Sequence, residues 1–127
     1  MEEAQLNALT EKIIACVYRV ADKLKYGYLE KVYENALRVE LERNDFRVEQ
    51  QKRLEVWYDG VLVGDYCADL VVNGLVLLEI KTCKTLDEAH KAQCLNYLQT
   101  TRLPCCLLIN FGPSVQLKRF RNFNAVF

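Results

Sequence analysis

Three ionisable residues in the middle of the chain could do chemistry together. Asp69 lies near the end of one apolar extended segment, and Glu79 and Lys81 interrupt the next one. Side chains two residues apart in a strand point to the same face, so the carboxylate and the ammonium of the second segment lie side by side. Burying such charges costs free energy unless a metal, a partner or a substrate compensates it. This stretch is therefore a candidate site.

The residue types of this stretch suit one kind of reaction. Two carboxylates that face one point are hard oxygen ligands for Mg²⁺ or Mn²⁺. A neighbouring lysine can orient or deprotonate a water molecule, or neutralise charge on a phosphate, so Asp69, Glu79 and Lys81 together indicate phosphodiester hydrolysis. The structural alternative is that Asp69 shapes a turn and Glu79 forms an ion pair with Lys81 at a solvated strand end. Spacing alone leaves both interpretations open.

A polar stripe on a later predicted helix could complete such a site. At about 100° per residue, His90, Gln93 and Tyr97 lie within about 60° of one another on a helix that we expect to be largely buried. Gln93 and Tyr97 would need hydrogen-bond partners there, and phosphate oxygens or the strand carboxylates would serve. Tyr97 could equally be an aromatic residue at the edge of the core. For His90 we favour hydrogen-bonded support of the site over a ligand role.

Glu30 offers a third carboxylate, at the start of another predicted helix. The helix dipole favours an acid in the first turn, so this position alone indicates a structural role. Nearby, a turn explains Gly27 and core packing explains Tyr33.

Eight helices and strands are expected to position these residues. Hydrophobic periodicity, together with a capping-box spacing from Thr85 to Glu88, sets their limits. The predicted helices span about 6–24, 29–43 and 85–99, and the predicted strands about 47–58, 61–72, 75–82, 105–111 and 115–121. This order, ααβββαββ, predicts an α/β fold with a mixed central sheet flanked by helices. The first three strands form an antiparallel meander, and the helical crossover makes two later strands parallel.

The turn between the two acid-bearing strands decides whether Asp69 and Glu79 can meet. A strict two-residue turn at Asn73-Gly74 would place the two acids on opposite faces of the sheet. A three-residue loop that pairs Val71 with Leu75, with a left-handed glycine in a bulge, would restore a common face. We predict that loop, or a bulge elsewhere between the acids.

The composition fits one soluble domain. The 127 residues are 51% hydrophobic, so we expect a single domain over residues 1–127. Seventeen basic and seventeen acidic residues cancel, which leaves no net attraction to nucleic acid or anionic membrane. We see neither a signal-like start nor an apolar run of membrane length, and we expect a cytoplasmic protein without membrane contact. The six cysteines form no Cys-x-x-Cys pair and are expected to be reduced and mostly buried.

In combination and order, the motifs resemble those of a known family. The chain carries Gly27-x-x-Glu30-x-x-Tyr33, Ala68-Asp69-Leu70, Glu79-Ile80-Lys81, His90-x-Ala92-Gln93, Asn96-Tyr97-Leu98 and Leu-Ile-Asn-Phe-Gly over 108–112. This pattern is similar to that of the GxxExxY protein family of the PD-(D/E)XK nuclease superfamily, and the resemblance covers nearly the whole chain.

The resemblance implies a restriction-endonuclease-like fold and a role for each acid. By this resemblance, Asp69 and Glu79 bind Mg²⁺ or Mn²⁺, Lys81 is the catalytic lysine, and Glu30 completes the ligand set. Ala68 stands where the motif that names the superfamily has proline. Because the acid and not the proline is the ligand, this departure leaves the implied metal site intact.

The resemblance also implies roles outside the metal ligands. Gln93 and Tyr97 match the Gln-x-x-x-Tyr motif of the RecB-like branch and are implied to order the substrate and the catalytic groups. His90 and Tyr33 are implied to support the site. Thr82 stands where the family has a small residue such as alanine, which affects local packing.

The implied function is a nuclease that cleaves nucleic acid with a metal-activated water, DNA being expected before RNA. Basic residues that could contact phosphates are Lys23, Lys25, Lys52, Arg53, Lys118, Arg119 and Arg121. One alternative is a nucleic-acid-binding or accessory module that keeps the fold without cleaving, and another is a structural interaction protein. A homodimer would enlarge the small surface for DNA, and we hold it as a hypothesis.

Overall fold

The computed structural model describes residues 2–123, and within them the helices and strands follow the predicted order ααβββαββ. Each strand begins within one residue of its predicted start. The elements are α1 (Glu3–Leu24), α2 (Glu30–Arg43), β1 (Val48–Tyr58), β2 (Val61–Val72), β3 (Val76–Lys81), α3 (Glu88–Thr101), β4 (Cys105–Phe111) and β5 (Val115–Arg121). No helix in this part of the chain combines the length and the apolar composition needed to cross a membrane.

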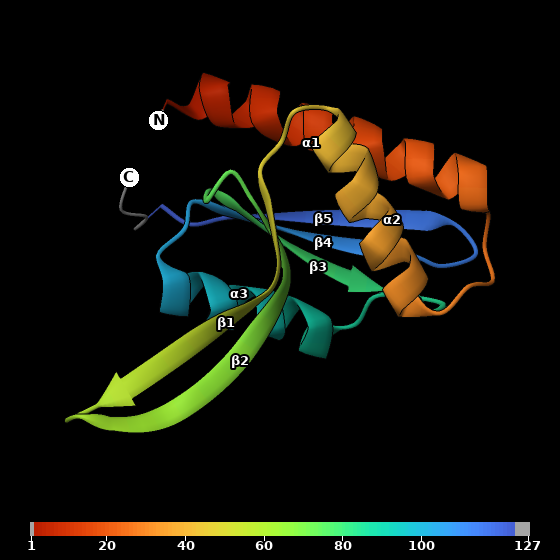
Figure 1. The fold of residues 1–127 in the computed structure, drawn as a ribbon. Coiled ribbons are helices and arrows are strands. Elements are labelled where there is room, and N and C mark those ends of the chain that lie inside the picture. Colours follow the sequence, from red (N-terminus) through yellow and green to blue (C-terminus); the bar gives the residue numbers. More distant parts are fainter. Residues whose placement is uncertain (1, 124–127) are drawn as a thin grey trace.

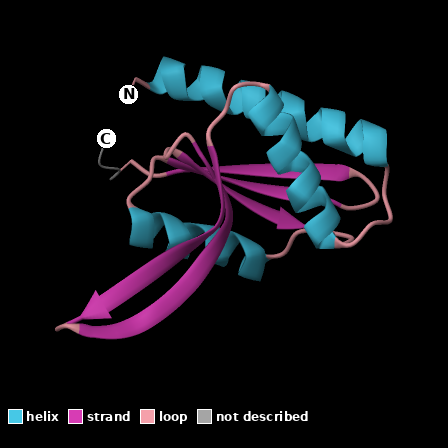
Figure 2. Ribbon diagram, in the orientation of Figure 1, coloured by secondary structure: helices cyan, strands magenta, loops and turns pink. Residues whose placement is uncertain are grey.

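The strands form one mixed sheet in the order β1-β2-β3-β4-β5. β1, β2 and β3 are the predicted antiparallel meander, and β4 pairs with β5 in antiparallel fashion. β3 and β4 are parallel because α3 carries the chain from one end of the sheet back to the other. Figure 1 shows α1 and α2 over one face of the sheet and α3 over the opposite face, and Figure 2 shows the same layers by element type.

Alternate residues of β3 enter two separate cores. Val76, Leu78 and Ile80 pack into the core beneath α1 and α2, whereas Leu77 packs into the core beneath α3. By the same alternation, Glu79 and Lys81 belong to the α3 face. The burial of both faces explains why this strand reads as a continuous apolar run before its charged end.

The loop between β2 and β3 has three residues, Asn73 to Leu75, and Val72 pairs with Val76. The predicted pairing of Val71 with Leu75 is wrong, because Val71 pairs with Leu77. Asn73 and Gly74 both have positive φ angles, 53° and 64°. The third residue of the loop is therefore Leu75, after Gly74, whereas the predicted loop began at Val72, before Asn73. The observed loop still shifts the register by the one residue required, and continuing the ladder sets Asp69 opposite Glu79.

Contacts with the start of β1 explain the position of this loop. The Asn73 backbone N–H donates to the Arg47 carbonyl at 2.8 Å, and the Arg47 N–H donates to Asn73 Oδ1 at 2.9 Å. Both bonds hold Asn73 at the first position of the loop. Val72 and Val76 are the last pair of the β2–β3 ladder, and both are fully buried. A shift of the register by one residue would turn one of these side chains to the other face of the sheet.

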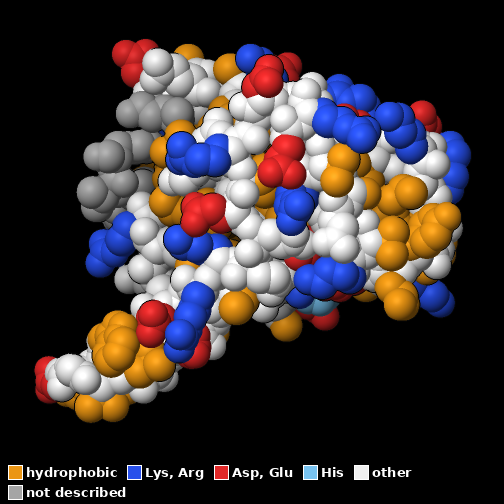
Figure 3. Space-filling model, in the orientation of Figure 1, with side chains coloured by type: hydrophobic (Ala, Val, Ile, Leu, Met, Phe, Trp, Pro, Cys, Tyr) orange, Lys and Arg blue, Asp and Glu red, His pale blue; other side chains and the backbone are white. Residues whose placement is uncertain are grey.

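The paired ends of β1 and β2, residues 55–65, form a two-stranded arm that projects from the body of the protein (Figure 1). Asp59 and Gly60, with φ angles of 48° and 78°, make the predicted two-residue turn at its tip. A bulge beside Val56 interrupts its register. Four large hydrophobic side chains on the arm are exposed: Trp57, Tyr58, Val61 and Val63. Figure 3 shows hydrophobic side chains on the surface of the arm at the lower left.

The start of α3 differs from the prediction. The capping box from Thr85 to Glu88 is wrong, because Asp87 is the N-cap and the helix begins at Glu88. The Asp87 carboxylate accepts the His90 N–H at 3.0 Å, and His90 Nδ1 accepts the Asp87 N–H at 3.3 Å. Aspartate is the stronger N-cap of the two residue types, and the N-cap lies two residues later than predicted.

α3 is also less buried than its sequence suggested. Its buried residues are Cys94, Tyr97 and Leu98, whereas Leu95 is 53% exposed. The helix therefore covers the sheet with one narrow face, and this face carries the stripe predicted from sequence.

Candidate functional site

Asp69 on β2 and Glu79 on β3 each bind the backbone of the neighbouring strand. The Asp69 N–H donates to Glu79 Oε1 at 3.2 Å, and the Ile80 N–H donates to Asp69 Oδ2 at 2.8 Å. The paired ladder between these strands ends at Leu70 and Leu78, so the two carboxylates continue the strand junction where backbone pairing stops. The acids that sequence analysis singled out thus lie next to each other.

Burial, with the charge of a neighbouring acid, makes both carboxylates hold their protons more tightly than usual: Asp69 acts on Glu79, and Glu34 acts on Asp69. Glu79 is only 2% exposed, and burial, followed by the charge of Asp69, raises its pKa to about 9. Burial also raises the pKa of Asp69, against the opposing effect of the Ile80 N–H. Two such oxygen donors in one place fit a divalent cation, because its charge stabilises the ionised form of both.

Lys81 completes the charged end of β3. The side chain is half-buried and forms neither a hydrogen bond nor an ion pair with any residue in the described part of the chain. Its charge nevertheless opposes the upward shift in the pKa of Glu79, of Asp69 and of Glu30, which places it among the three acids. Since Glu79 is buried, the alternative of a Glu79–Lys81 ion pair at a solvated strand end does not describe the structure.

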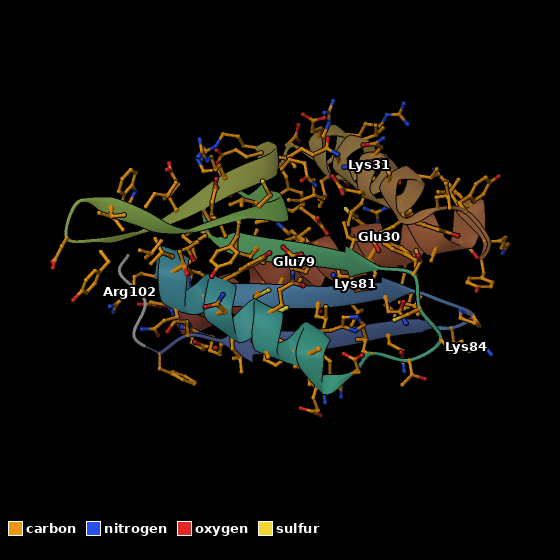
Figure 4. The ribbon with its side chains drawn as sticks, turned by 90° about the horizontal axis from the view of Figure 1, so that it is seen from below. Glu30, Lys31, Glu79, Lys81, Lys84 and Arg102 are labelled. Atoms are coloured by element: carbon orange, nitrogen blue, oxygen red, sulfur yellow. The ribbon has the colours of Figure 1, made fainter. Side chains whose placement is uncertain are left out.

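Glu30 is the first residue of α2, and Figure 4 shows it near the end of β3 that carries Glu79 and Lys81. Although the residue as a whole is exposed, loss of solvent around its carboxylate raises its pKa. The charges of Lys81 and Asp69 act on it in opposite directions. Glu30 therefore faces the same region as the strand acids.

The acids are not gathered into a closed ligand cage. Within residues 2–123, no three His, Cys, Asp or Glu side chains lie close enough together to hold a metal ion between them. Asp69 and Glu79 are adjacent, whereas Glu30 is a neighbour. Mg²⁺ fits this arrangement, since proteins commonly bind it through one or two carboxylates while it keeps several water molecules.

Tyr33 positions the segment that leads to Glu30. Its hydroxyl donates to the Lys25 carbonyl and accepts the Tyr28 N–H at 3.3 Å. Its ring is 1% exposed and stacks on Phe111 with centroids 4.8 Å apart. Gly27 within this segment has a φ angle of 130°, which favours glycine. Tyr33 therefore acts on the site through the backbone before α2.

α3 brings the predicted polar stripe toward the acids. Gln93 Nε2 donates to the Tyr97 hydroxyl at 3.1 Å, and Tyr97 is 5% exposed. Burial and then the charge of Glu79 raise the pKa of Tyr97, so its hydroxyl lies near the strand acids. His90, besides capping α3, lies close enough to Glu30 for its protonated form to lower the pKa of Glu30. Sequence reasoning thus identified three side chains that converge on one region.

The structure adds two residues that sequence reasoning missed, Glu34 and Gln51. Glu34 is 2% exposed, and its Oε2 accepts hydrogen bonds from Gln50 Nε2 at 2.6 Å, Gln51 Nε2 at 3.0 Å and Lys31 Nζ at 3.0 Å. Gln51 Nε2 also donates to Asp69 Oδ1 at 3.3 Å. The four-residue spacing from Glu30 could have revealed Glu34, because it places both acids on one helix face.

Most basic residues proposed as phosphate contacts are engaged elsewhere. Ion pairs join Lys52 to Glu49, Arg53 to Asp65, and Arg119 and Arg121 to Glu3, while Lys23 and Lys25 pair with Glu40 and Asp22. Lys84 in the loop after β3 and Arg102 at the end of α3 (Figure 4) have neither ion pairs nor side-chain hydrogen bonds within residues 2–123. Arg102, however, lies at the end of α3 away from Glu30 and Lys81 (Figure 4).

Comparisons with known proteins agree with this architecture. The solved structure described as "Crystal structure of SSO0001" matches 76% of this chain with a TM-score of 0.59 and 18% sequence identity, which supports the fold alone. The chain spans 50% of that protein's length. A search of curated proteins finds no matching sequence. The family model of the PD-(D/E)XK nuclease superfamily matches residues 7–121, and the chain therefore belongs to this superfamily.

Proposed function

We propose that this protein is a divalent-metal-dependent nuclease that hydrolyses phosphodiester bonds, with DNA as the preferred polymer. The observation that carries the proposal is the half-buried Asp69 carboxylate next to the buried Glu79 carboxylate, with the ammonium of Lys81 beside them. Membership of a nuclease superfamily supports the same reaction class. Within that superfamily, we propose that the chain belongs to the GxxExxY family and to the RecB-like branch.

The acids and the lysine of the site would have different roles in such a reaction. Asp69 and Glu79, with Glu30 nearby, would hold Mg²⁺ or Mn²⁺, which would supply an activated water and charge stabilisation. The ammonium group of Lys81 has no hydrogen-bond or ion-pair partner among residues 2–123, so it can hold a water molecule or a phosphate oxygen. It is the only cation of β3.

The side chains of α3 supply hydrogen-bonding groups on the other side of the site. The Tyr97 hydroxyl, which accepts from Gln93, keeps its own proton free to donate to a phosphate oxygen. His90 holds the first turn of α3 in place through its contacts with Asp87. We propose that this face orders the substrate against the strand acids.

The decisive experiment measures cleavage of labelled DNA and RNA with Mg²⁺ or Mn²⁺. Lys81→Ala and Glu79→Gln should each lose activity by at least about a hundredfold, because each removes a group that stabilises developing charge. Lys12→Ala, an exposed lysine of α1, serves as the matched control and should cleave like the wild type. Unchanged cleavage by both site variants would refute the assignment.

The exposed arm favours a second candidate, an accessory or interaction role. Trp57 and Tyr58 are 59% and 68% exposed, and exposed apolar side chains of this size often mark a binding surface. A homodimer through such a surface would also enlarge the area available to DNA. Calorimetry with Mn²⁺ separates the candidates, since only the nuclease requires metal binding, and sedimentation measures the oligomeric state.

We also propose that the protein acts in the cytoplasm. Cys16, Cys94, Cys105 and Cys106 are buried free thiols, the form that a reducing compartment maintains.

A further inference from the structure

We propose that Gln51 is a positioning residue that ties α2 to the metal-binding carboxylate of Asp69. This inference rests on the proposed function. The side-chain amide of Gln51 donates to Glu34 Oε2 at 3.0 Å and to Asp69 Oδ1 at 3.3 Å. An amide nitrogen carries two hydrogens, so these two bonds use its full donor capacity. One side chain thus joins a helix and a strand that both carry site acids.

The backbone of Gln51 is adapted to this task. Its φ angle is 53°, in the left-handed region that residues with a side chain rarely adopt. The β1–β2 ladder pairs Gln50 with Leu70 and Lys52 with Ala68, so Gln51 stands opposite Asp69 without a regular pair. A strained residue within an otherwise regular strand requires compensation from its surroundings. The two bonds to carboxylates are the compensation that the structure shows.

Glu34, the partner of Gln51 on α2, is held by further hydrogen bonds. Glu34 is 2% exposed and also accepts from Lys31 Nζ at 3.0 Å and from Gln50 Nε2 at 2.6 Å. Gln50 itself accepts from Arg38 at 3.0 Å. Glu34 therefore cannot follow Gln51 freely, and it acts as a fixed point on α2.

The two hydrogen bonds of Gln51 fix the orientation of the Asp69 carboxylate and the distance between Asp69 and Glu30. Asp69 has one oxygen held by the Ile80 N–H at 2.8 Å and the other by Gln51, which fixes the plane of its carboxylate. Glu34 lies one turn after Glu30 on the same face of α2, so holding Glu34 also fixes how far Glu30 lies from Asp69. The amide hydrogens between Glu34 and Asp69 separate two negative charges that would otherwise repel.

The test uses a substitution that relieves the backbone while it removes the amide. Gln51→Gly suits the left-handed conformation, and Asp45→Gly, at a φ angle of 66° in the exposed turn after α2, is its matched control. Calorimetry measures Mn²⁺ affinity, urea unfolding measures stability, and cleavage of labelled DNA measures turnover.

Both glycine variants should remain folded, but they should differ in metal affinity. We expect Gln51→Gly to lose about tenfold in Mn²⁺ affinity, the effect typical of residues that orient metal ligands, and Asp45→Gly to bind like the wild type. Wild-type affinity in Gln51→Gly would overturn this inference while leaving the proposed function intact. A wild-type protein that neither binds Mn²⁺ nor cleaves nucleic acid would overturn the proposed function first, and this inference with it.

Discussion

Glu79 Oε1 accepts the backbone N–H of Asp69 at 3.2 Å, and the Asp69 carboxylate in turn accepts the N–H of the residue after Glu79 at 2.8 Å. Each acid therefore acts both as a candidate ligand and as a clamp between β2 and β3. An alanine at either position would leave a buried N–H without its partner, which is destabilising in itself. Amide variants, which keep an acceptor oxygen, are the better probes of chemistry.

The metal-free protein should lose stability as the pH rises. The pKa of Glu79 is about 9 when folded and about 4.5 in the absence of burial, so both states keep the proton below the lower value. Between the two values the unfolded chain releases its proton first, which favours unfolding by at most about 1.4 kcal/mol per pH unit. Urea unfolding between about pH 5 and pH 9 measures this slope.

Glu79→Gln cannot ionise at that position and should show a shallower slope than the wild type. Glu11→Gln, in an exposed acid of α1, is the control and should keep the wild-type slope. Identical slopes in the wild type and in Glu79→Gln would contradict the raised pKa of Glu79.

Metal binding should release protons. A cation held by Asp69 and Glu79 requires their ionised forms, and burial raises the pKa of both. Mn²⁺ affinity should therefore rise with pH, by up to about tenfold per unit where one proton is displaced. Calorimetry in two buffers with different ionisation enthalpies counts the protons, and Asp69→Asn should remove most of the binding. An affinity that is constant with pH would be evidence against binding by these acids.

Tyr97→Phe should separate the contribution of the Tyr97 hydroxyl group to turnover from the contribution of its ring to stability. The ring lies 5.6 Å from that of Tyr66 and keeps this contact in the variant, so stability should change by about 1 kcal/mol or less. Loss of the hydroxyl should reduce turnover about fivefold, the equivalent of one hydrogen bond. Steady-state cleavage kinetics and urea unfolding measure the two effects. A large loss of stability with normal turnover would indicate a purely structural tyrosine.

Tyr33→Phe should loosen the segment before α2 without emptying the core. The ring would still stack on Phe111, while the bonds to Lys25 and Tyr28 would be lost. We expect destabilisation by about 1 kcal/mol per lost bond. Tyr33→Ala should cost about 3–5 kcal/mol, because it also leaves a cavity. Hydrogen exchange of residues 25–29 should increase in Tyr33→Phe, and unchanged exchange would argue against the anchoring role.

The fluorescence of Trp57 should report on the arm. It is the only tryptophan of the chain and is 59% exposed, so the native protein should emit at the long wavelength typical of hydrated indole. Acrylamide should quench this emission almost as well in the native state as in urea. Protection from quenching at high protein concentration would show that copies associate through the arm, and a blue-shifted emission at low concentration would contradict its exposure.

Hydrophobic periodicity was sufficient to predict the sheet and its connections. The apolar run of β3, buried on both sides, and the Asp59-Gly60 turn are local signals, and the structure confirms the elements that they predict. The turn at Asn73 shows the limit of local signals. Its loop depends on bonds to Arg47, 26 residues earlier in the chain, which no local pattern reveals.

The placement of the candidate site residues was predictable where it follows from alternation along a strand or from spacing along a helix. Glu79, Lys81, Gln93 and Tyr97 belong to this group. Gln51 could not be predicted in this way, because its left-handed backbone breaks the alternation that assigns side chains to faces. A polar residue in a half-exposed strand also gives no sign that its partners lie on a helix.

The arm is useful for protein engineering because its tip lies beyond the elements that set the Asp69–Glu79 register. That register depends on the Asn73 loop, at the opposite end of β2 from Asp59 and Gly60. A short epitope or a cysteine for a fluorescent dye, inserted between Asp59 and Gly60, would leave the strand junction and both cores in place. The tip is thus a natural attachment point for labels that follow the protein on nucleic acid.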